Sequence, residues 1–262
     1  MFEKKHHNYS YALVISELIK LAHRHNFSIK KIGEEKFEHI GMTYPLYRFT
    51  VNPRAPKKFC IIAGVHGYEI AGPLTIPHLF EFPKKYFKKE IAYYIYPILN
   101  PTSFDLDRRM DDDNRDLNCL NRRTLKSRNY REIQAFYNDI KKLRFDALIS
   151  MHEDLDETNF YAYVFEKEKN PVYRQIVRSA SRFTGVETKK MIYQSPSDGH
   201  GLVINVHDQA IEDRFFCMKQ AKTSLTSETP GKLDISLRIK INSENIKIIN
   251  RSILSRQSGL KK

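Results

Sequence analysis

Apolar and polar positions follow two alternating periods along this chain. Residues 9–25 carry apolar side chains at positions 11, 14, 15, 18, 21 and 22, which predicts an amphipathic helix. Short apolar runs predict strands at 28–32, 46–51, 59–63, 91–99, 145–149, 160–165 and 223–227. Further helices are expected at 68–82, 129–143, 171–184, 208–220 and 233–255. This alternation predicts an α/β fold, in which helices cover both faces of a mostly parallel or mixed, twisted sheet.

The domain organisation follows from what the chain lacks. Its 262 residues are enough to bury a substantial core. The sequence contains no internal repeat, low-complexity segment or linker. We therefore expect one domain over residues 1–262, with a frayed end at its last few residues.

The apolar run 59–63 is followed at once by two side chains that can bind a metal. Lys57-Lys58 and Gly64 bound this run, as is typical of a strand buried on both faces. His66 and Glu69 come next, and ligands of open α/β sheets bind beyond the carboxyl ends of strands. Zinc accepts imidazole nitrogen and carboxylate oxygen as ligands. A single His-x-x-Glu is a short motif, so the rest of the chain has to support it.

Two further side chains are expected at strand ends. His152 comes just past the strand predicted at 145–149, and Glu228 directly follows the strand predicted at 223–227. Two imidazoles and one carboxylate form a known catalytic zinc set. A fourth carboxylate outside the ligand set suits a general base.

Residues 100–123 are strongly polar and irregular. A loop of this length inside a compact domain is usually functional. The alternative is a solvated surface loop without a role in chemistry.

Composition narrows the class of partner. The formal charge of +13 favours nucleic acid, but the lysines are dispersed as pairs without a basic helix stripe, a Cys/His finger or an aromatic RNA-binding motif. A basic, solvated surface is the better interpretation, and no nucleic-acid partner is expected. No apolar run approaches the roughly 20 residues of a membrane helix, so no membrane partner is expected either.

The N-terminal residues and the cysteines indicate the cellular compartment. The polar N-terminal residues lack the apolar core of a signal peptide. Cys60, Cys119 and Cys217 are far apart and form no C-x-x-C pair, which is typical of reduced thiols. We therefore expect a cytoplasmic protein. The sequence leaves the oligomeric state open.

The candidate residues occur in an ordered series of motifs. The series is His66-Gly-Tyr-Glu69, Asn100-Pro101, Arg109 nine positions before the Asn118 of Asp116-Leu-Asn118, Ser150-Met-His152, and Glu228 before the last helix. In this order the sequence resembles the zinc carboxypeptidase family, the carboxypeptidase A-like metallopeptidases. It also resembles the related aspartoacylase and succinylglutamate desuccinylase branch. The resemblance covers residues 59–230 and implies a zinc carboxypeptidase-like fold.

The resemblance implies a role for each motif residue. One zinc ion would be held by His66, Glu69 and His152, with Glu228 as the general base. Arg109 would stabilise the oxyanion that develops during attack. Asn118 would help to bind a carboxylate of the substrate.

The implied activity is zinc-dependent hydrolysis of a peptide or amide bond. The substrate would be a peptide or an acylated amino acid that carries a carboxylate. A metallocarboxypeptidase is the first expectation, and an N-acyl-amino-acid amidohydrolase is the alternative within the enzymes. A binding protein that keeps the fold without turnover is the alternative outside them.

The chain departs from the family pattern at two places. The family usually has arginine after Asp-Leu-Asn, where this chain has Cys119. A thiol cannot replace a guanidinium in binding a carboxylate, so Arg115, Arg122 or Arg123 would have to take this role. For the substrate-facing tyrosine, Tyr193 has the expected local context but lies further ahead of Glu228 than the family's tyrosine. Tyr161 and Tyr163 compete for the same role.

Overall fold

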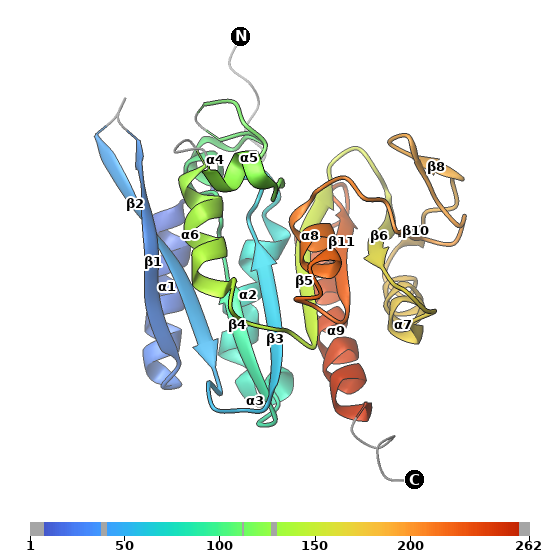
Figure 1. Cartoon of the computed structure of the whole chain (residues 1–262), viewed down its shortest axis with the longest axis horizontal. Helices are drawn as coiled ribbons and strands as arrows, with labels where there is room; N and C mark the ends of the chain where they lie inside the picture. The colour runs from blue at the N-terminus through green and yellow to red at the C-terminus, as the bar shows by residue number, and fades with distance from the viewer. Residues whose placement is uncertain (1–7, 38–40, 112, 127–129, 257–262) are drawn as a thin grey trace.

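The central feature is a mixed β-sheet with the strand order β1-β2-β4-β3-β5-β11-β6-β10 (Figure 1). The computed structural model describes residues 8–37, 41–111, 113–126 and 130–256. The strands of the sheet are β1 Ser28–Phe37, β2 Met42–Val51, β3 Lys57–Ala63, β4 Ile91–Tyr96, β5 Ala147–Asp154, β6 Asn159–Phe165, β10 Leu202–Ile204 and β11 Ser224–Pro230. The short strand β7, Gly185–Val186, pairs with β6. Outside this sheet, β8 (Met191–Ile192) and β9 (Ser195–Pro196) form a small hairpin.

The middle of the sheet is parallel. β4, β3, β5 and β11 run in the same direction, whereas β1, β2 and β4 pair antiparallel at one side. On the other side, β11 pairs antiparallel with β6. The predicted mostly parallel or mixed sheet is therefore confirmed.

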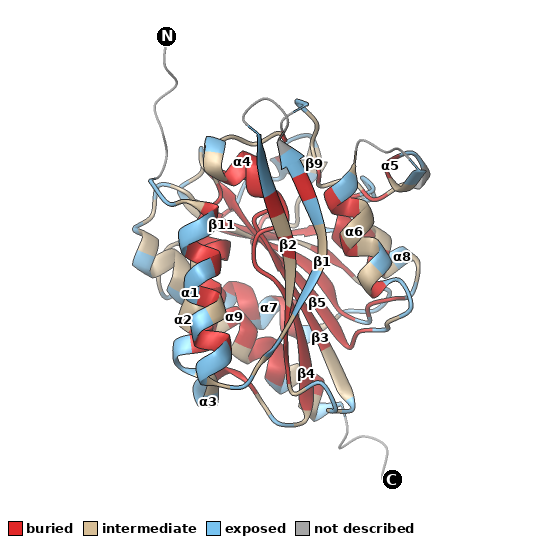
Figure 2. Cartoon of the chain, turned by 90° about the vertical axis from the view of Figure 1, so that its left-hand side faces the viewer, coloured by how far each residue is buried: buried red, intermediate tan, exposed pale blue. Residues whose placement is uncertain are grey.

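Helices cover both faces of the sheet (Figures 1 and 2). The helices are α1 Tyr11–Arg24, α2 Ala71–Glu81, α3 Pro83–Tyr86, α4 Pro101–Leu106, α5 Arg122–Lys126, α6 Arg131–Ile140, α7 Pro171–Ala180, α8 Ile211–Cys217 and α9 Ile235–Ser255. One face carries α1, α2, α7 and α9, and the other carries α6 and α8. Among the described residues, no helix combines the length and the apolar character that a bilayer crossing requires.

The strand β3 contributes to a separate apolar core on each face. Phe59 and Ile61 belong to the core under α1, α2 and α9, while Cys60 and Ile62 belong to the core under α6 and α8. All four side chains are fully buried, because successive residues of a strand point to opposite faces and both faces are covered here. The predicted strand, buried on both faces, is confirmed.

Two expectations about element boundaries are wrong. His152 and Glu228 lie inside β5 and β11 and not just past their ends, because both strands continue further than their apolar runs. The segment 100–123 is not irregular throughout, since α4 occupies its beginning. Asn100 caps this helix by accepting a hydrogen bond from the Ser103 N–H at 3.3 Å, and Pro101 suits its first position.

Candidate active site

The loop after β3 packs tightly enough to bury His66 at the carboxyl end of the sheet. Gly64 has a φ of 61°, in the left-handed region that favours glycine. A Cβ atom on Gly67 would lie 1.9 Å from the carbonyl oxygen of Ser103, so this position has no room for a side chain. The close approach to α4 leaves both His66 and Glu69 almost fully buried.

Three buried side chains that can bind a metal ion converge at the carboxyl end of the sheet. Glu69 Oε1 lies 2.6 Å from His66 Nδ1, and Glu69 Oε2 lies 2.8 Å from His152 Nδ1. The two Nδ1 atoms are 3.2 Å apart. Each of the three residues offers one atom that could bind a metal ion, and these three atoms all lie within 4.8 Å of one another. The structure therefore brings together His66, Glu69 and His152 from the β3 loop and from β5.

Asp116 fixes the orientation of the His66 ring. His66 Nε2 lies 3.1 Å from Asp116 Oδ1, so a neutral His66 keeps its proton on Nε2 and presents the Nδ1 lone pair to a metal ion. The same carboxylate accepts hydrogen bonds from the Asn118 N–H at 2.8 Å and from Arg109 Nη2 at 3.0 Å. The sequence analysis quoted Asp116 as part of Asp-Leu-Asn and gave it no role, because its partner is distant in sequence.

The electrostatics of the three donors suit a bound cation. Burial raises the pKa of Glu69, but His66 and His152 more than offset this and hold the pKa at about 2. Burial lowers the pKa of His66, and the Glu69 carboxylate outweighs it and raises the pKa to about 9. Charge balance in this site therefore comes from protons on the imidazoles or from a metal in their place. Two nitrogens and one carboxylate fit a divalent zinc ion.

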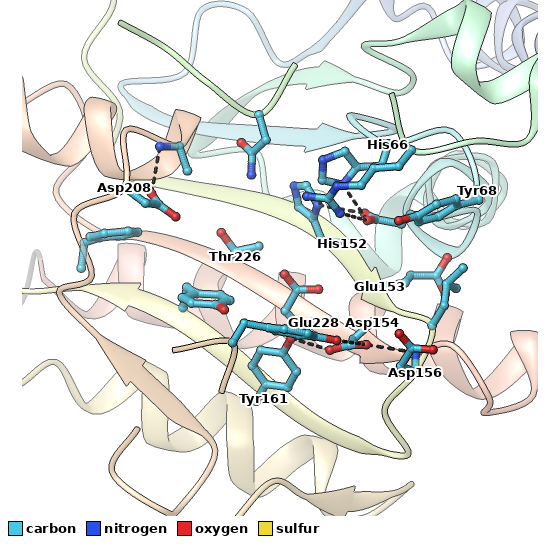
Figure 3. A pocket seen from close by; sticks show the side chains of 18 residues that line it. His66, Tyr68, His152, Glu153, Asp154, Asp156, Tyr161, Asp208, Thr226 and Glu228 are labelled. Atoms are coloured by element: carbon cyan, nitrogen blue, oxygen red, sulfur yellow. Dashed lines mark hydrogen bonds and ion pairs between the residues drawn. The ribbon is translucent and has the colours of Figure 1, made fainter. Parts of the chain in front are cut away.

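Glu228 lies beside this group without belonging to it. It is in register with His152 on the neighbouring parallel strand and with Tyr161 on the antiparallel strand β6. Its side chain points into the cavity (Figure 3). Burial raises its pKa to about 8, the His152 imidazole opposes this, and Glu69 adds to it.

A cavity of about 420 Å³ connects these groups. Of the residues that the sequence singled out, those that line it are His66, Glu69, Arg109, Asn118, His152, Tyr161, Tyr163, Tyr193 and Glu228. Residues that the sequence analysis passed over also line it: Tyr68, Glu153, Asp154, Asp156 and Asp208. Tyr68 stands within the His66-Gly-Tyr-Glu69 motif and Glu153 directly follows His152, whereas Asp154, Asp156 and Asp208 belong to no motif.

The arginines of the polar segment take different positions. Arg109 is the one arginine or lysine among the described residues that line the cavity. Burial opposes its charge, but Asp116 and Glu69 raise its pKa further, so it remains charged. Arg115 does not line the cavity, because Asp111 and Asp113 hold its guanidinium at 2.7 and 2.5 Å. The side chain of Arg122 lies outside the described residues.

Two tyrosines share the carboxylate of Asp154. The Tyr161 hydroxyl donates to Asp154 Oδ2 at 2.7 Å, and the Tyr193 hydroxyl donates to Oδ1 at 3.1 Å. Tyr161 is buried, whereas Tyr193 is 64 % exposed at the turn between β8 and β9. Of these two tyrosines, Tyr193 is therefore the one that an entering molecule can reach.

Comparison with known proteins shows the family of the chain. Residues 55–229 match the model of the succinylglutamate desuccinylase/aspartoacylase catalytic domain. The chain belongs to this family. The expected membership of the carboxypeptidase-like group, and of its desuccinylase/aspartoacylase branch, is confirmed. No curated protein sequence matches the chain.

Solved structures share the fold. A candidate metallopeptidase from Shewanella amazonensis is 21% identical, with a TM-score of 0.77 over 92% of each chain. A metallo-carboxypeptidase from Burkholderia cenocepacia is 15% identical, with a TM-score of 0.70 over 95% of this chain and 70% of that one. A Pseudomonas aeruginosa metallo-carboxypeptidase in complex with (2-guanidinoethylmercapto)succinic acid is 16% identical, with a TM-score of 0.64 over 94% of this chain and 69% of that one.

Proposed function

We propose that this protein is a zinc-dependent hydrolase that cleaves a peptide or amide bond next to a carboxylate of its substrate. The observation that carries the proposal is the buried group of His66, Glu69 and His152, with the Glu228 carboxylate across the cavity. The enzymes for which the family is named remove acyl groups, which agrees with hydrolysis. In the proposal the three converging donors hold one zinc ion.

The chain's own groups supply the proton transfers and the charge stabilisation. Bound zinc activates water and polarises the carbonyl that is attacked. Glu228 takes a proton from the attacking water and delivers it to the leaving amine. The Arg109 guanidinium donates hydrogen bonds to the oxyanion, a contribution of about 3–4 kcal/mol in comparable sites. Asp116 fixes this guanidinium by accepting from Nη2 at 3.0 Å and from Nε at 3.2 Å.

Asn118 and Tyr193 suit the binding of the substrate carboxylate. Asn118 Oδ1 accepts a hydrogen bond from the Ile211 N–H at 3.3 Å, which leaves the amide N–H₂ to donate toward the cavity. The Tyr193 hydroxyl, which donates to Asp154 Oδ1 at 3.1 Å, would have to turn from that carboxylate to donate to the substrate. In this proposal Arg109 supplies the positive charge that Cys119 cannot. Arg122 is an additional candidate, and Arg115 is committed to its two aspartates.

Two substrate classes agree with the site. Peptides with a free C-terminus come first, because the fold is shared with metallo-carboxypeptidases. N-acyl amino acids come second, because the matching family is named for enzymes that act on them. The Pseudomonas protein was solved with a succinic acid derivative, and a carboxylate is common to both classes.

The test compares the zinc-loaded protein with Glu228→Gln on three sets of compounds. These are peptides with free C-termini, the same peptides amidated at the C-terminus, and N-acyl amino acids. We expect hydrolysis of carboxylate-bearing compounds, lowered by about 10²–10⁴-fold in Glu228→Gln at equal zinc content. Equal cleavage of free and amidated peptides would contradict carboxylate recognition. Turnover that survives in Glu228→Gln would place the base elsewhere, and no hydrolysis by either protein would support a binding role.

A further inference from the structure

A second group of metal-binding side chains lies outside the candidate active site. It consists of His207, in the connection after β10, and of Asp213 and Cys217 on α8. Asp213 and Cys217 are four residues apart, so they share one side of the helix. In the part of the chain that the structure describes, this group and the His66, Glu69 and His152 group are the ones whose donor atoms all lie within 4.8 Å of each other.

The three donor atoms are close enough to share one ion. Asp213 Oδ1 lies 2.6 Å from His207 Nδ1 and 3.2 Å from Cys217 Sγ, and Sγ lies 3.6 Å from Nδ1. Zinc–ligand bonds of about 2.0–2.3 Å in a tetrahedron separate such donors by about 3.3–3.6 Å. The distance between Cys217 Sγ and His207 Nδ1 already has this length, whereas the distance between Sγ and Asp213 Oδ1 is slightly shorter. The histidine and aspartate must separate by roughly 0.7 Å, and the His207 side chain, exposed to 52%, is free to make this movement.

The Asp213 carboxylate is already oriented to bind an ion together with His207 and Cys217. Its Oδ2 accepts a hydrogen bond from the Gln209 N–H at 2.9 Å, and its side chain is buried. Oδ1 is thereby directed at the two exposed partners. The same arrangement excludes a catalytic Cys-His-Asp triad. In such a triad the cysteine contacts one ring nitrogen of the histidine and the aspartate contacts the other. Here Cys217 and Asp213 both contact Nδ1 of His207.

We infer that His207, Asp213 and Cys217 form a second site for a borderline-soft divalent ion such as Zn²⁺. The nitrogen, oxygen and sulfur ligands come from the chain, and water or an external ligand completes the tetrahedron. Binding releases the thiol proton, because the thiolate is the form that ligates metal. Affinity for the ion therefore falls as the pH is lowered.

The site lies behind the wall of the candidate active-site cavity. Asp208, next to His207, and Ala210, three residues after it, both line this cavity. The Gln209 carbonyl accepts a hydrogen bond from the Leu120 N–H at 2.8 Å, and the Ile211 N–H donates to Asn118 Oδ1. An ion that joins His207 to α8 therefore fixes the segment that holds Asn118. This second site is a positioning site, and its existence does not depend on the proposed hydrolase activity.

Cobalt(II) tests the site directly, because a thiolate ligand gives a sulfur-to-cobalt charge-transfer band that the His66, Glu69 and His152 group cannot give. The full-length, reduced protein is titrated with Co²⁺ as wild type and as His152→Ala, Cys217→Ser, His207→Ala and Cys119→Ser. The band should occur in wild type, His152→Ala and Cys119→Ser, and it should be lost in Cys217→Ser and His207→Ala. Both of the latter replace exposed side chains, so the fold should be retained. Bound cobalt should fall from two ions per chain in wild type to one in Cys217→Ser.

Three results would overturn the inference: no band in the wild type, a band that persists in Cys217→Ser, or a band that is lost in Cys119→Ser. The last result would assign the thiolate to the polar segment beside the active-site cavity. A wrong assignment of His66, Glu69 and His152 as metal ligands would give a different result. His152→Ala would then bind as much cobalt as the wild type, while the charge-transfer band would still be lost only in Cys217→Ser and His207→Ala.

Discussion

Asp116 is the residue on which several parts of the cavity depend. Its two oxygens contact His66 Nε2, the Asn118 N–H and the Arg109 guanidinium. Burial disfavours its charge, but His66 and Arg109 outweigh burial and lower its pKa, so the carboxylate is ionised. One negative charge thus orients a candidate metal ligand and a candidate oxyanion donor together.

We expect Asp116→Asn to weaken zinc binding by about 10–100-fold, because an amide supports the His66 ring less strongly than a carboxylate. The dissociation constant, measured by competition with a chelator of known affinity, checks this. Asp113→Asn is the matched control, since Asp113 is exposed and pairs with Arg115 away from the cavity. Equal losses of affinity in both variants would show that the effect is one of overall charge.

At the scale of secondary-structure elements, two acids meet where α6 packs against β1. Glu35 on β1 and Glu132 on α6 are both buried, and their carboxyl groups are hydrogen-bonded to each other. Burial is the main cause that raises both pKa values, and for Glu132 the contact with Glu35 adds to it. Thr102 donates to Glu35 at 3.0 Å, and Arg115 is engaged by Asp111 nearby. The contact between the Glu35 and Glu132 carboxyl groups is therefore most favourable when the two groups share a proton.

The raised pKa values give a pH dependence of stability with a definite sign. Between the ordinary glutamate pKa and the raised values, the folded chain binds more protons than the unfolded chain. This stabilisation is complete below about pH 4.5 and is lost as the pH rises. Glu132→Gln donates a hydrogen bond to Glu35 at every pH. It should therefore raise the free energy of unfolding at pH 8 by about 1–3 kcal/mol, the cost of an unsatisfied buried group.

Urea unfolding at pH 5 and pH 8 measures this difference. The gain from Glu132→Gln should be larger at pH 8 than at pH 5. Glu34→Gln is a suitable control, because Glu34 is exposed and pairs with Lys31. A gain that is the same at both pH values would contradict a shared proton.

How well the sequence predicted each element depended on its side chains. α1 was predicted to within two residues, because its buried positions repeat with a helical period and Ser10 caps it. β5 and β11 were predicted too short, because His152, Glu153 and Glu228 are polar and were interpreted as lying beyond the strands. α4 was missed, because a six-residue helix is too short to show a period.

The candidate site was predictable only where a motif is local. His66 and Glu69 are three residues apart, and their position after an apolar strand is visible in the sequence. The contact of Asp116 with His66 spans fifty residues, and that of His207 with Asp213 depends on a turn between them. The direction of the Arg115 side chain is set by Asp111 and could not be inferred from spacing to Asn118.

At the scale of the whole molecule, a bound ion would join distant parts of the chain. His66 follows β3 in the first third of the chain, and His152 belongs to β5. A ligand that binds the folded state alone stabilises it by about 2.7 kcal/mol at one hundred times its dissociation constant. For a chain of this size, that corresponds to roughly 5–10 °C in Tm.

We therefore expect removal of zinc by a chelator to lower Tm by about 5–10 °C. The measurement is made in the Cys217→Ser background, so that an ion at His207 makes no contribution. His152→Ala in the same background should start from a lower Tm and respond little to the chelator. An equal response in both proteins would mean that the stabilising ion is bound elsewhere.

Among the strands that the structure describes, β11 is synthesised last, yet it lies inside the sheet between β5 and β6. While a ribosome makes the roughly 60 residues from the end of β6 to the start of β11, both neighbours have an open edge. At ordinary rates of translation this interval lasts roughly 3–12 s. Open strand edges pair readily with other chains. We therefore expect slower production at low temperature, with added chaperone, to increase the yield of folded protein.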